Sequence, residues 1–432
     1  MSLLSFLPFL IVISGSYLLF KLDFFFIKHP IRTLKFAFSG ENKKKSLLSL
    51  MLALAGTLGV GNISGVAIGI AIGGAGSVFW LIFSAVFSAA IKYSEVYIAY
   101  RFGGVGMISV IKSSFKVYGV PLAYIYAALT VVLSISMGSV FQARAIAQSS
   151  SNTDFFNVYI LGAALSVFVA TVCLIGKKQI KNTVAFIIPI AMIIYTGMCI
   201  VVIFNNFEKI PSVVFKIISS AFSYKGVSGG IIGFIVSSGM KEGFARGLLS
   251  NEAGAGTSAF SHTSHLEETN SSTTGLHSGN ITSEAKRQSI EYQRAGIYGI
   301  LEVFFDTLLL CPLTAFAILL AYDDKSFSGS VADLSNIFAT NITPSASLVL
   351  TCSIISFAIS TVLCWYYYGK TALGFIMRNK GYRIYSTLFF CSFFLAITME
   401  IPYALFITDT ALFLLSVISL SAVIKNRAYL NE

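Results

Sequence analysis

The chain is 432 residues long, 56% hydrophobic and only 11% charged, with a net charge of +11 and a mean hydropathy of +0.80. Because ordinary soluble domains carry about 25% charged residues, this composition excludes a soluble globular protein and indicates that lipid covers much of the surface. The positive charge does not indicate a nucleic-acid partner, because the basic residues lie where the loops of a membrane protein are expected.

A helix needs about 20 apolar residues to cross a hydrocarbon layer of about 30 Å. By that measure the sequence predicts eleven spans and therefore an all-α, multi-pass membrane protein. In chain order their approximate bounds are 3–20, 47–72, 76–100, 120–147, 156–175, 183–205, 227–265 with an interruption, 295–321, 346–369, 382–399 and 402–424.

The loops on one side of these spans are rich in basic residues. Seven Lys and Arg residues lie at 21–45, and more follow in each later loop on that side, with Lys92 counted among them. Cytoplasmic loops carry an excess of Lys and Arg, so we expect the amino terminus outside and the carboxyl terminus in the cytoplasm. The basic residues clearly on the other side are Lys209, Lys216, Lys225 and Lys325.

Glycine interrupts two of the predicted spans, with GTLGVGNISG at 56–65 and SNEAGAGTS at 250–258. If the first span is set aside, the other ten form two groups of five, and each interruption lies in the first helix of its group. Because five is odd, the groups enter the membrane from opposite sides, as inverted repeats with discontinuous helices do. Close helix packing is the alternative. It does not explain the polar side chains at membrane depth, which are Thr57, Asn62, Asn251 and Glu252.

Longer stretches around both interruptions resemble one family of carriers. The segments at 56–80, at 91–102 (IKYSEVYIAYRF) and at 242–256 (EGFARGLLSNEAGAG) resemble the signatures of the alanine or glycine:cation symporter family, a branch of the amino acid–polyamine–organocation carriers. The resemblance covers roughly residues 45 to 370. A polar insertion at about 266–294, and Ser139 where an Asn is usual, make the chain similar to a divergent member.

The resemblance implies a leucine-transporter-like fold of two inverted five-helix repeats with discontinuous first helices, plus one extra N-terminal helix. The expected organisation is an extra helix and basic cytoplasmic loop at 1–46, a first repeat at 47–210, and a second repeat at 211–432 that contains the insertion. It also implies sodium-coupled symport of a small neutral amino acid, such as alanine or glycine, across a plasma membrane of the bacterial inner-membrane type.

The two interruptions are the expected substrate site. Amides freed at the start of a half-helix bind anions, and freed carbonyls attract cations, so unwound glycine backbone suits the charged ends of an amino acid. Close packing remains the alternative for the same glycines. The resemblance adds Gln142 and Trp365, although a Trp near a span end is often an interface anchor. The substrate-site residues are thus Thr57, Gly59, Gly61, Asn62, Gln142, Asn251, Gly254, Gly256 and Trp365.

Oxygen-bearing side chains at membrane depth are candidate sodium ligands, because hard cations prefer oxygen. Asn62 offers an amide oxygen, and the resemblance implies a second sodium site at the adjacent hydroxyls of Ser360 and Thr361. A Ser-Thr pair taken alone often bonds its own helix carbonyls instead. Asp306 lies in mid-span, where a carboxylate could serve a cation, carry a proton or pair with a neighbouring helix.

The remaining charges near the second interruption, Glu242, Arg246 and Glu252, are expected to form a structural ion-pair set. We find no nucleotide cradle and no catalytic dyad or triad, so neither an enzyme nor an ATP-driven pump is expected. Two alternatives to a sodium symporter stay open: a proton-coupled carrier using Asp306, and a transporter-derived amino acid sensor or receptor. The expected partners are the amino acid and the lipid bilayer, with no nucleic acid.

Overall fold

The computed structural model describes residues 6–39, 43–150, 157–222, 238–264, 281–322, 327–378, 380–399 and 404–431. Within these ranges the regular structure is helical and no strand is present, which confirms the all-α prediction. Seven helices there are long and apolar enough to cross a membrane, or eight if one bent pair counts as a span. Leu7–Lys21 and Tyr382–Thr398 are apolar but shorter. Eleven spans and the inverted repeats therefore stay predictions.

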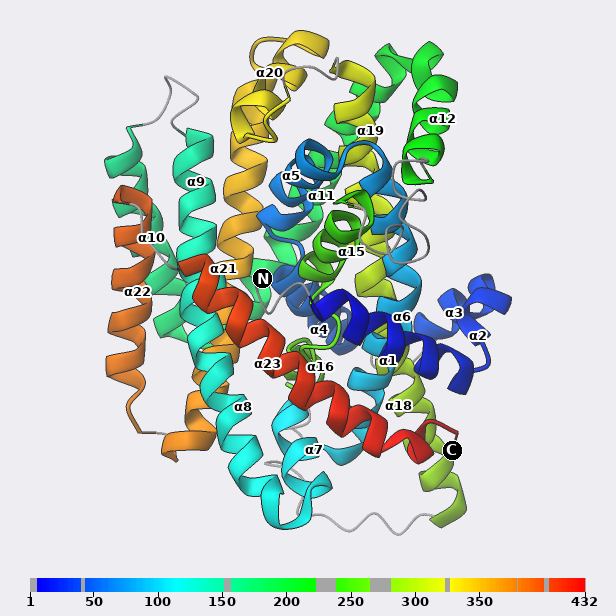
Figure 1. Cartoon of the computed structure of the whole chain (residues 1–432). Coiled ribbons are helices and arrows are strands. Elements are labelled where there is room, and N and C mark those ends of the chain that lie inside the picture. Colours follow the sequence, from blue (N-terminus) through cyan, green and yellow to red (C-terminus); the bar gives the residue numbers. More distant parts are fainter. Residues whose placement is uncertain are drawn as a thin grey trace.

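The first part of the chain builds a short peripheral group and the first interrupted helix. α1 (Leu7–Lys21) leads into two short helices at the edge of the molecule (Figure 1). The interrupted helix, α4 and α5, follows them, and the remaining helices of this part run to α12. Their bounds are α2 Phe25–Lys28, α3 Pro30–Ala37, α4 Lys43–Thr57, α5 Ser64–Gly73, α6 Gly76–Phe102, α7 Gly106–Ser114, α8 Gly119–Leu133, α9 Gln142–Ser150, α10 Val158–Ile175, α11 Lys177–Asn205 and α12 Ile210–Ala221.

The second part repeats the pattern of an interrupted helix followed by long ones. Residues 266–280 of the expected polar insertion lie outside the described residues, whereas 281–294 form the first turns of α18. The bounds are α15 Ser238–Asn251, α16 Ala259–Thr263, α18 Ile281–Val303, α19 Cys311–Ala321, α20 Val331–Asn341, α21 Ala346–Met377, α22 Tyr382–Thr398 and α23 Ala404–Lys425.

Both interrupted helices lie in the interior. Figure 1 shows α4, α5, α15 and α16 in the centre of the molecule, with α6 on one side and α21 on the other. α6 packs against α1, α15 and α18, and α21 packs against α4, α8 and α11. The polar residues of the interruptions are therefore held inside protein, away from lipid.

Two long helices contain a π-helical segment near this centre. One is Ser134–Phe141 between α8 and α9, and the other is Phe304–Leu310 between α18 and α19. A π-helical turn widens the helix and is frequent at functional sites. The first segment directly precedes Gln142, and the second contains Asp306.

The assignment of Lys92 to an inner loop is wrong. Lys92 lies within α6, and its side chain is fully buried. A buried ammonium group is stable only when it is paired and hydrogen-bonded, so its position points to partners inside the protein.

Candidate functional site

The first interruption is a sharp bend between α4 and α5. The helix axes on its two sides, Leu47–Thr57 and Val60–Gly73, meet at 63°. At Gly59 a Cβ would lie 3.1 Å from the Thr361 hydroxyl and 3.3 Å from the Gln142 amide, so glycine permits this close approach. At Gly61 and Gly65 a Cβ would meet nothing within 4 Å. The bend therefore combines a tight side with an open side.

The open side faces the start of α5. No side chain caps the amino-terminal end of this helix. The amides of a helix's first turn have no partner within the helix, and the helix dipole adds partial positive charge there. Gly65 lies in that first turn without a side chain in the way. This end of α5 therefore suits a carboxylate.

Gln142 contacts the bend from α9, and Trp365 of α21 packs against Gly138 in the π-helical segment that precedes Gln142. Gln142 is buried, and its Oε1 accepts a hydrogen bond from the Val60 amide at 3.4 Å. Trp365 is fully buried in α21, so the interface-anchor alternative is wrong. Its ring packs edge-on against Tyr368, and its indole nitrogen has no hydrogen-bond partner among the described residues. A buried donor without a partner suits a polar ligand.

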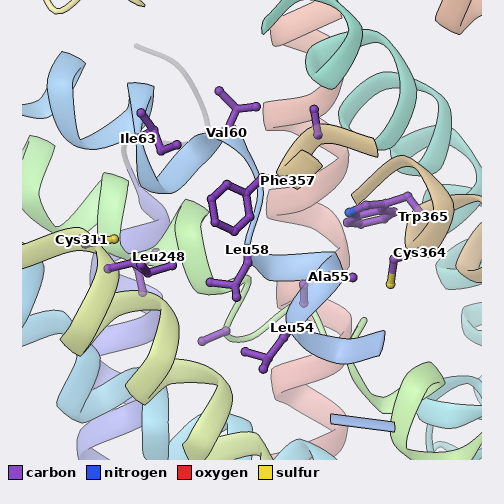
Figure 2. Packing of buried hydrophobic residues seen from close by; sticks show 14 of the residues in the cluster. Leu54, Ala55, Leu58, Val60, Ile63, Leu248, Cys311, Phe357, Cys364 and Trp365 are labelled. Atoms are coloured by element: carbon purple, nitrogen blue, oxygen red, sulfur yellow. The ribbon is translucent and has the colours of Figure 1, made fainter. Parts of the chain in front are cut away.

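Apolar side chains enclose the bend. Figure 2 shows the Phe357 ring of α21 between Leu58 and Val60. Leu58 and Val60 are fully buried and Phe357 is 2% exposed. Electrostatic interactions are stronger where water is excluded, so polar groups at the bend act in a low-dielectric environment.

Four oxygen atoms converge beside the bend. The Ser250 hydroxyl lies 2.7 Å from Asn62 Oδ1 and 2.8 Å from both Asp306 carboxylate oxygens. Asp306 is fully buried, and no described basic side chain forms an ion pair with it. Its carboxylate also accepts a hydrogen bond from the Thr307 hydroxyl at 2.8 Å.

This cluster has more acceptors than hydroxyl donors. The hydroxyls of Ser250 and Thr307 supply two hydrogens, whereas Asn62 Oδ1 and the two Asp306 oxygens are three acceptors. A buried carboxylate without full compensation is costly. Neutral amide, hydroxyl and carboxylate oxygens are the ligands that hard cations prefer. The oxygen atoms of Asn62, Ser250 and Asp306 therefore suit a hard cation or a proton.

The hydroxyls of Thr57, Ser360 and Thr361 donate hydrogen bonds to carbonyls of their own helices. Thr57 donates to the carbonyls of Ala53 and Leu54 at 3.4 and 3.3 Å. The Ser360 and Thr361 hydroxyls donate to carbonyls four residues earlier, at 2.9 and 3.0 Å. A hydroxyl that donates in this way keeps its lone pairs. Thr361 is brought to the bend through Gly59, whereas no described contact joins Ser360 to it.

The second interruption, between α15 and α16, is closed by packing. Gly254 and Gly256 have φ angles of +93° and +72°, which side-chain-bearing residues rarely adopt. A Cβ at Gly254 would lie 2.8 Å from Ile11, and one at Gly256 would lie 2.5 Å from Met107. The geometry at these two positions favours the packing alternative over an open ligand site.

Asn251 stabilises this second interruption. Its Oδ1 accepts from the Ala253 amide at 2.9 Å, and its Nδ2 donates to Thr307 at 3.1 Å. Thr307 in turn donates to Asp306. Asn251 therefore links the second interruption to the oxygen cluster through one hydroxyl.

A buried ion-pair network crosses the second interruption. Lys92 lies 3.2 Å from Glu302 and donates to Ser258 at 2.8 Å, and His262 lies 2.6 Å from the other Glu302 oxygen. Glu252 accepts from the Thr257 hydroxyl at 2.7 Å. The network joins α6, α16 and α18, and it was not predicted as a unit.

The expected ion-pair set is correct for one pair and wrong for the third member. Arg246 and Glu242 lie 3.0 Å apart, one helical turn from each other on α15. Glu252 is absent from that pair, because its backbone leaves the helix at φ +52° and turns the carboxylate toward Thr257. The helical spacing of Glu302 and Asp306 would have signalled a polar helix face.

The chain is similar to known proteins over almost its whole length. The model of a family described as the sodium:alanine symporter family matches residues 1–428. The sodium/alanine symporter AgcS of Methanococcus maripaludis is 28% identical over 427 residues, covering 93% of this chain and 88% of that protein. A putative sodium/proton-dependent alanine carrier protein, YrbD of Bacillus subtilis, is 27% identical over 368 residues, covering 79% and 69%.

The fold is similar to that of solved structures, one of which is a transporter. The crystal structure of a mutant manganese transporter from Eremococcus coleocola aligns with a TM-score of 0.53 over 89% of this chain and 71% of that chain. The two sequences are only 12% identical, so the likeness concerns the arrangement of helices alone.

Proposed function

The chain belongs to the sodium:alanine symporter family, a family of transporters and not of enzymes, and from this premise we propose sodium-coupled symport of a small neutral amino acid across the plasma membrane. Cation-coupled amino acid transport is the family's activity. The proposal names the ion, the substrate size and the residues that hold them.

The observation that carries the proposal is the oxygen cluster of Asn62, Ser250 and Asp306 beside the α4–α5 bend. Its acceptors outnumber its hydroxyl hydrogens, and a sodium ion would supply the missing positive charge. We assign the cation to this cluster. Thr361, which faces Gly59 across the bend, is the nearer of the two α21 hydroxyls for a second ion.

The amino acid is assigned to the open side of the same bend. Its carboxylate would lie at the uncapped start of α5, where Gly61 and Gly65 leave space. Gln142 and Trp365 would bound the side chain, so a small residue fits and a large one does not. Asn251, Gly254 and Gly256 support this site from the second interruption. The cation and the carboxylate then lie at one bend, so each favours binding of the other, which is the requirement for coupling.

Proteoliposome uptake tests this function. Labelled alanine, glycine and serine are offered to the purified, reconstituted protein with an inward sodium gradient, with sodium equal on both sides, and without sodium. Accumulation of alanine or glycine only under the gradient is the expected result. Equal uptake in all three conditions would contradict sodium coupling, and no uptake of any of the three would contradict the substrate class.

Proton coupling is the second candidate, because Asp306 is a fully buried carboxylate without an ion-pair partner among the described residues. The similarity to a putative sodium/proton-dependent alanine carrier supports testing it. In the same liposomes, a pH gradient replaces the sodium gradient. Uptake driven by the pH gradient in sodium-free buffer, and lost in Asp306→Asn, would identify the proton as the coupling ion.

We also propose an orientation with the amino terminus outside and the carboxyl terminus in the cytoplasm, from the distribution of basic residues. Reporter fusions after Lys45 and at the carboxyl terminus should both read cytoplasmic. A reporter after Lys209 should read external. The reverse pattern at all three positions would overturn the orientation without affecting the site.

A further inference from the structure

The peripheral helices α2 and α3 form a short amphipathic unit. Ile27, Ile31, Leu34 and Phe38 are 48%, 70%, 47% and 44% exposed. The spacing of Ile31 and Leu34 places these two on one face of α3. Ile27 lies in α2, on the other side of the break at His29. An exposed apolar stripe on a short helix with basic residues is typical of a helix that lies in the membrane interface. Figure 1 shows α2 and α3 at the edge of the molecule.

The other face of this unit is fixed to the protein body. Tyr298 of α18 donates to the Ala37 carbonyl at 2.8 Å. The Arg294 guanidinium lies over the Phe36 ring at 5.5 Å, and Phe25 packs edge-on against Tyr93 of α6 with ring centroids 5.1 Å apart. The unit is therefore a docked element with a defined inner surface.

A cavity of about 440 Å³ lies between this inner surface and the helices α6 and α18. Its walls combine apolar and basic side chains. The apolar wall includes Phe25, Phe36 and Ile297, and the basic wall consists of Lys21, His29 and Arg32. Lys21 is the last residue of the apolar helix α1, which is where hydrocarbon gives way to headgroups.

The charge of the cavity is positive. Its one acidic lining residue, Asp23, lies 2.6 Å from Lys28 and is thereby neutralised. The side chains of Lys21 and Arg32 form no ion pair with any residue that the structure describes. Two cationic groups thus face a cavity whose other side is hydrocarbon-like.

We propose that this cavity binds one anionic phospholipid of the membrane. The phosphate lies between Lys21 and Arg32, and acyl chains follow the apolar wall. Basic pockets between helices at the cytoplasmic side of a membrane recognise anionic headgroups in this way. The bound lipid would hold α2 and α3 against α6 and α18, the helices that carry Lys92 and Glu302, and thereby stabilise the folded protein.

Purified, delipidated protein tests the proposal by thermal unfolding during titration with phosphatidylglycerol or phosphatidylcholine in the same detergent. Native mass spectrometry counts the lipids retained. The variant is Lys21→Gln with Arg32→Gln. The matched control, Lys35→Gln with Lys178→Gln, also loses two charges but leaves the cavity walls unchanged.

Wild type and control should each retain one phosphatidylglycerol per chain and gain thermal stability from it, with little gain from phosphatidylcholine. The cavity variant should need roughly 30-fold more phosphatidylglycerol for half of the stability gain, because two basic contacts are lost. Equal responses to the two lipids, or equal responses of variant and control, would overturn the proposal. So would the same stabilisation by inorganic phosphate alone, or retention of a polypeptide in place of lipid.

Discussion

The two interrupted helices look alike in sequence but differ in their surroundings. At the α4–α5 bend, a Cβ on Gly61 would meet nothing within 4 Å. At the α15–α16 interruption, Gly254 and Gly256 adopt positive φ angles and lie against Ile11 and Met107. The same residue type therefore opens space for a ligand in one helix and permits close packing in the other.

The polar groups of the two regions also differ, because those of the first have too few donors and most of those of the second are paired. The first region has neutral Asn and Ser oxygens around Asp306, without a basic partner in the described chain. In the second, Lys92 and Glu302 form an ion pair, and His262 completes it. The oxygen cluster at the first bend lacks donors and suits a ligand, whereas the paired set of Lys92, Glu302 and His262 stabilises the fold. Glu252 also belongs to the second region, and its Oε1 has no hydrogen-bond partner among the described residues. We therefore assign ligand binding to the first interruption and stabilisation of the fold to the second.

The largest expected effect is at the two sets of glycines. Gly254→Val should destabilise the protein by about 2 to 5 kcal/mol, because it combines a positive φ with overpacking. Gly61→Val should leave the fold intact and abolish uptake. Size-exclusion profiles in detergent report folding, and proteoliposome uptake reports function. A well-folded Gly254→Val that fails only in binding would contradict the division of roles.

Asp306→Asn should reduce sodium-driven uptake roughly 10- to 100-fold, because a hydrogen-bonded charge contact contributes about 1.5 to 3 kcal/mol. The protein should stay folded, since the amide can still bond Ser250 and Thr307. The matched change at the second interruption, Glu252→Gln, should leave the sodium concentration for half-maximal uptake unchanged. An equal loss in both variants would remove the distinction between the two regions.

Gln142→Ala should raise the alanine concentration for half-maximal uptake about fivefold, because it removes one hydrogen bond to the bend, worth about 1 kcal/mol. Trp365→Phe keeps an aromatic ring but removes the indole donor, and should have a similar effect. Concentration series of alanine uptake measure both. Unchanged values in both variants would place the substrate elsewhere.

The smallest effect, on thermal stability, is expected in the loop at residues 327–330, which packs against α5. Gly329 packs on this helix, with Ala67 and Ala71 at 3.0 Å from a Cβ position, and the loop is held by Asp333. Partial burial raises the pKa of Asp333, but hydrogen bonds from Ser328 and Ser330 outweigh it and hold the pKa below its ordinary value.

A carboxylate with a lowered pKa in the folded state stabilises above its unfolded pKa, and the effect fades as pH falls through the folded value. Asp333→Asn should therefore lower the thermal stability slightly at pH 7. The difference in melting temperature between the variant and wild type should become smaller as the pH falls. Melting curves from about pH 3 to pH 7 would measure it. A difference that grows in acid would contradict the assigned role.

The sequence predicted both interruptions, because glycine-rich stretches with Asn and Thr stand out within apolar spans. The family resemblance named Gln142 and Trp365 as substrate-site residues, and the mid-span position of Asp306 made it a candidate for a cation or a proton; all three side chains are buried. The sequence did not predict the pairing of Lys92 with Glu302, because these residues lie 210 positions apart and meet only through the packing of α6 on α18.

The sequence also did not predict that there is free space beside Gly61 but close packing against Gly254 and Gly256. Neither the positive φ of Gly254 nor the approach of Ile11 follows from local composition. The approach of Ile11 depends on where α1 packs, and nothing in the glycine-rich stretch itself specifies that contact.

Direct sodium binding tests the central claim, that the cation site belongs to the first interruption. Purified wild type, Asp306→Asn and Glu252→Gln are titrated with radioactive sodium in a scintillation assay, with and without alanine. We predict saturable binding, strengthened by alanine, in wild type and Glu252→Gln, and its loss in Asp306→Asn. Sodium binding that survives in Asp306→Asn and disappears in Glu252→Gln would contradict the account.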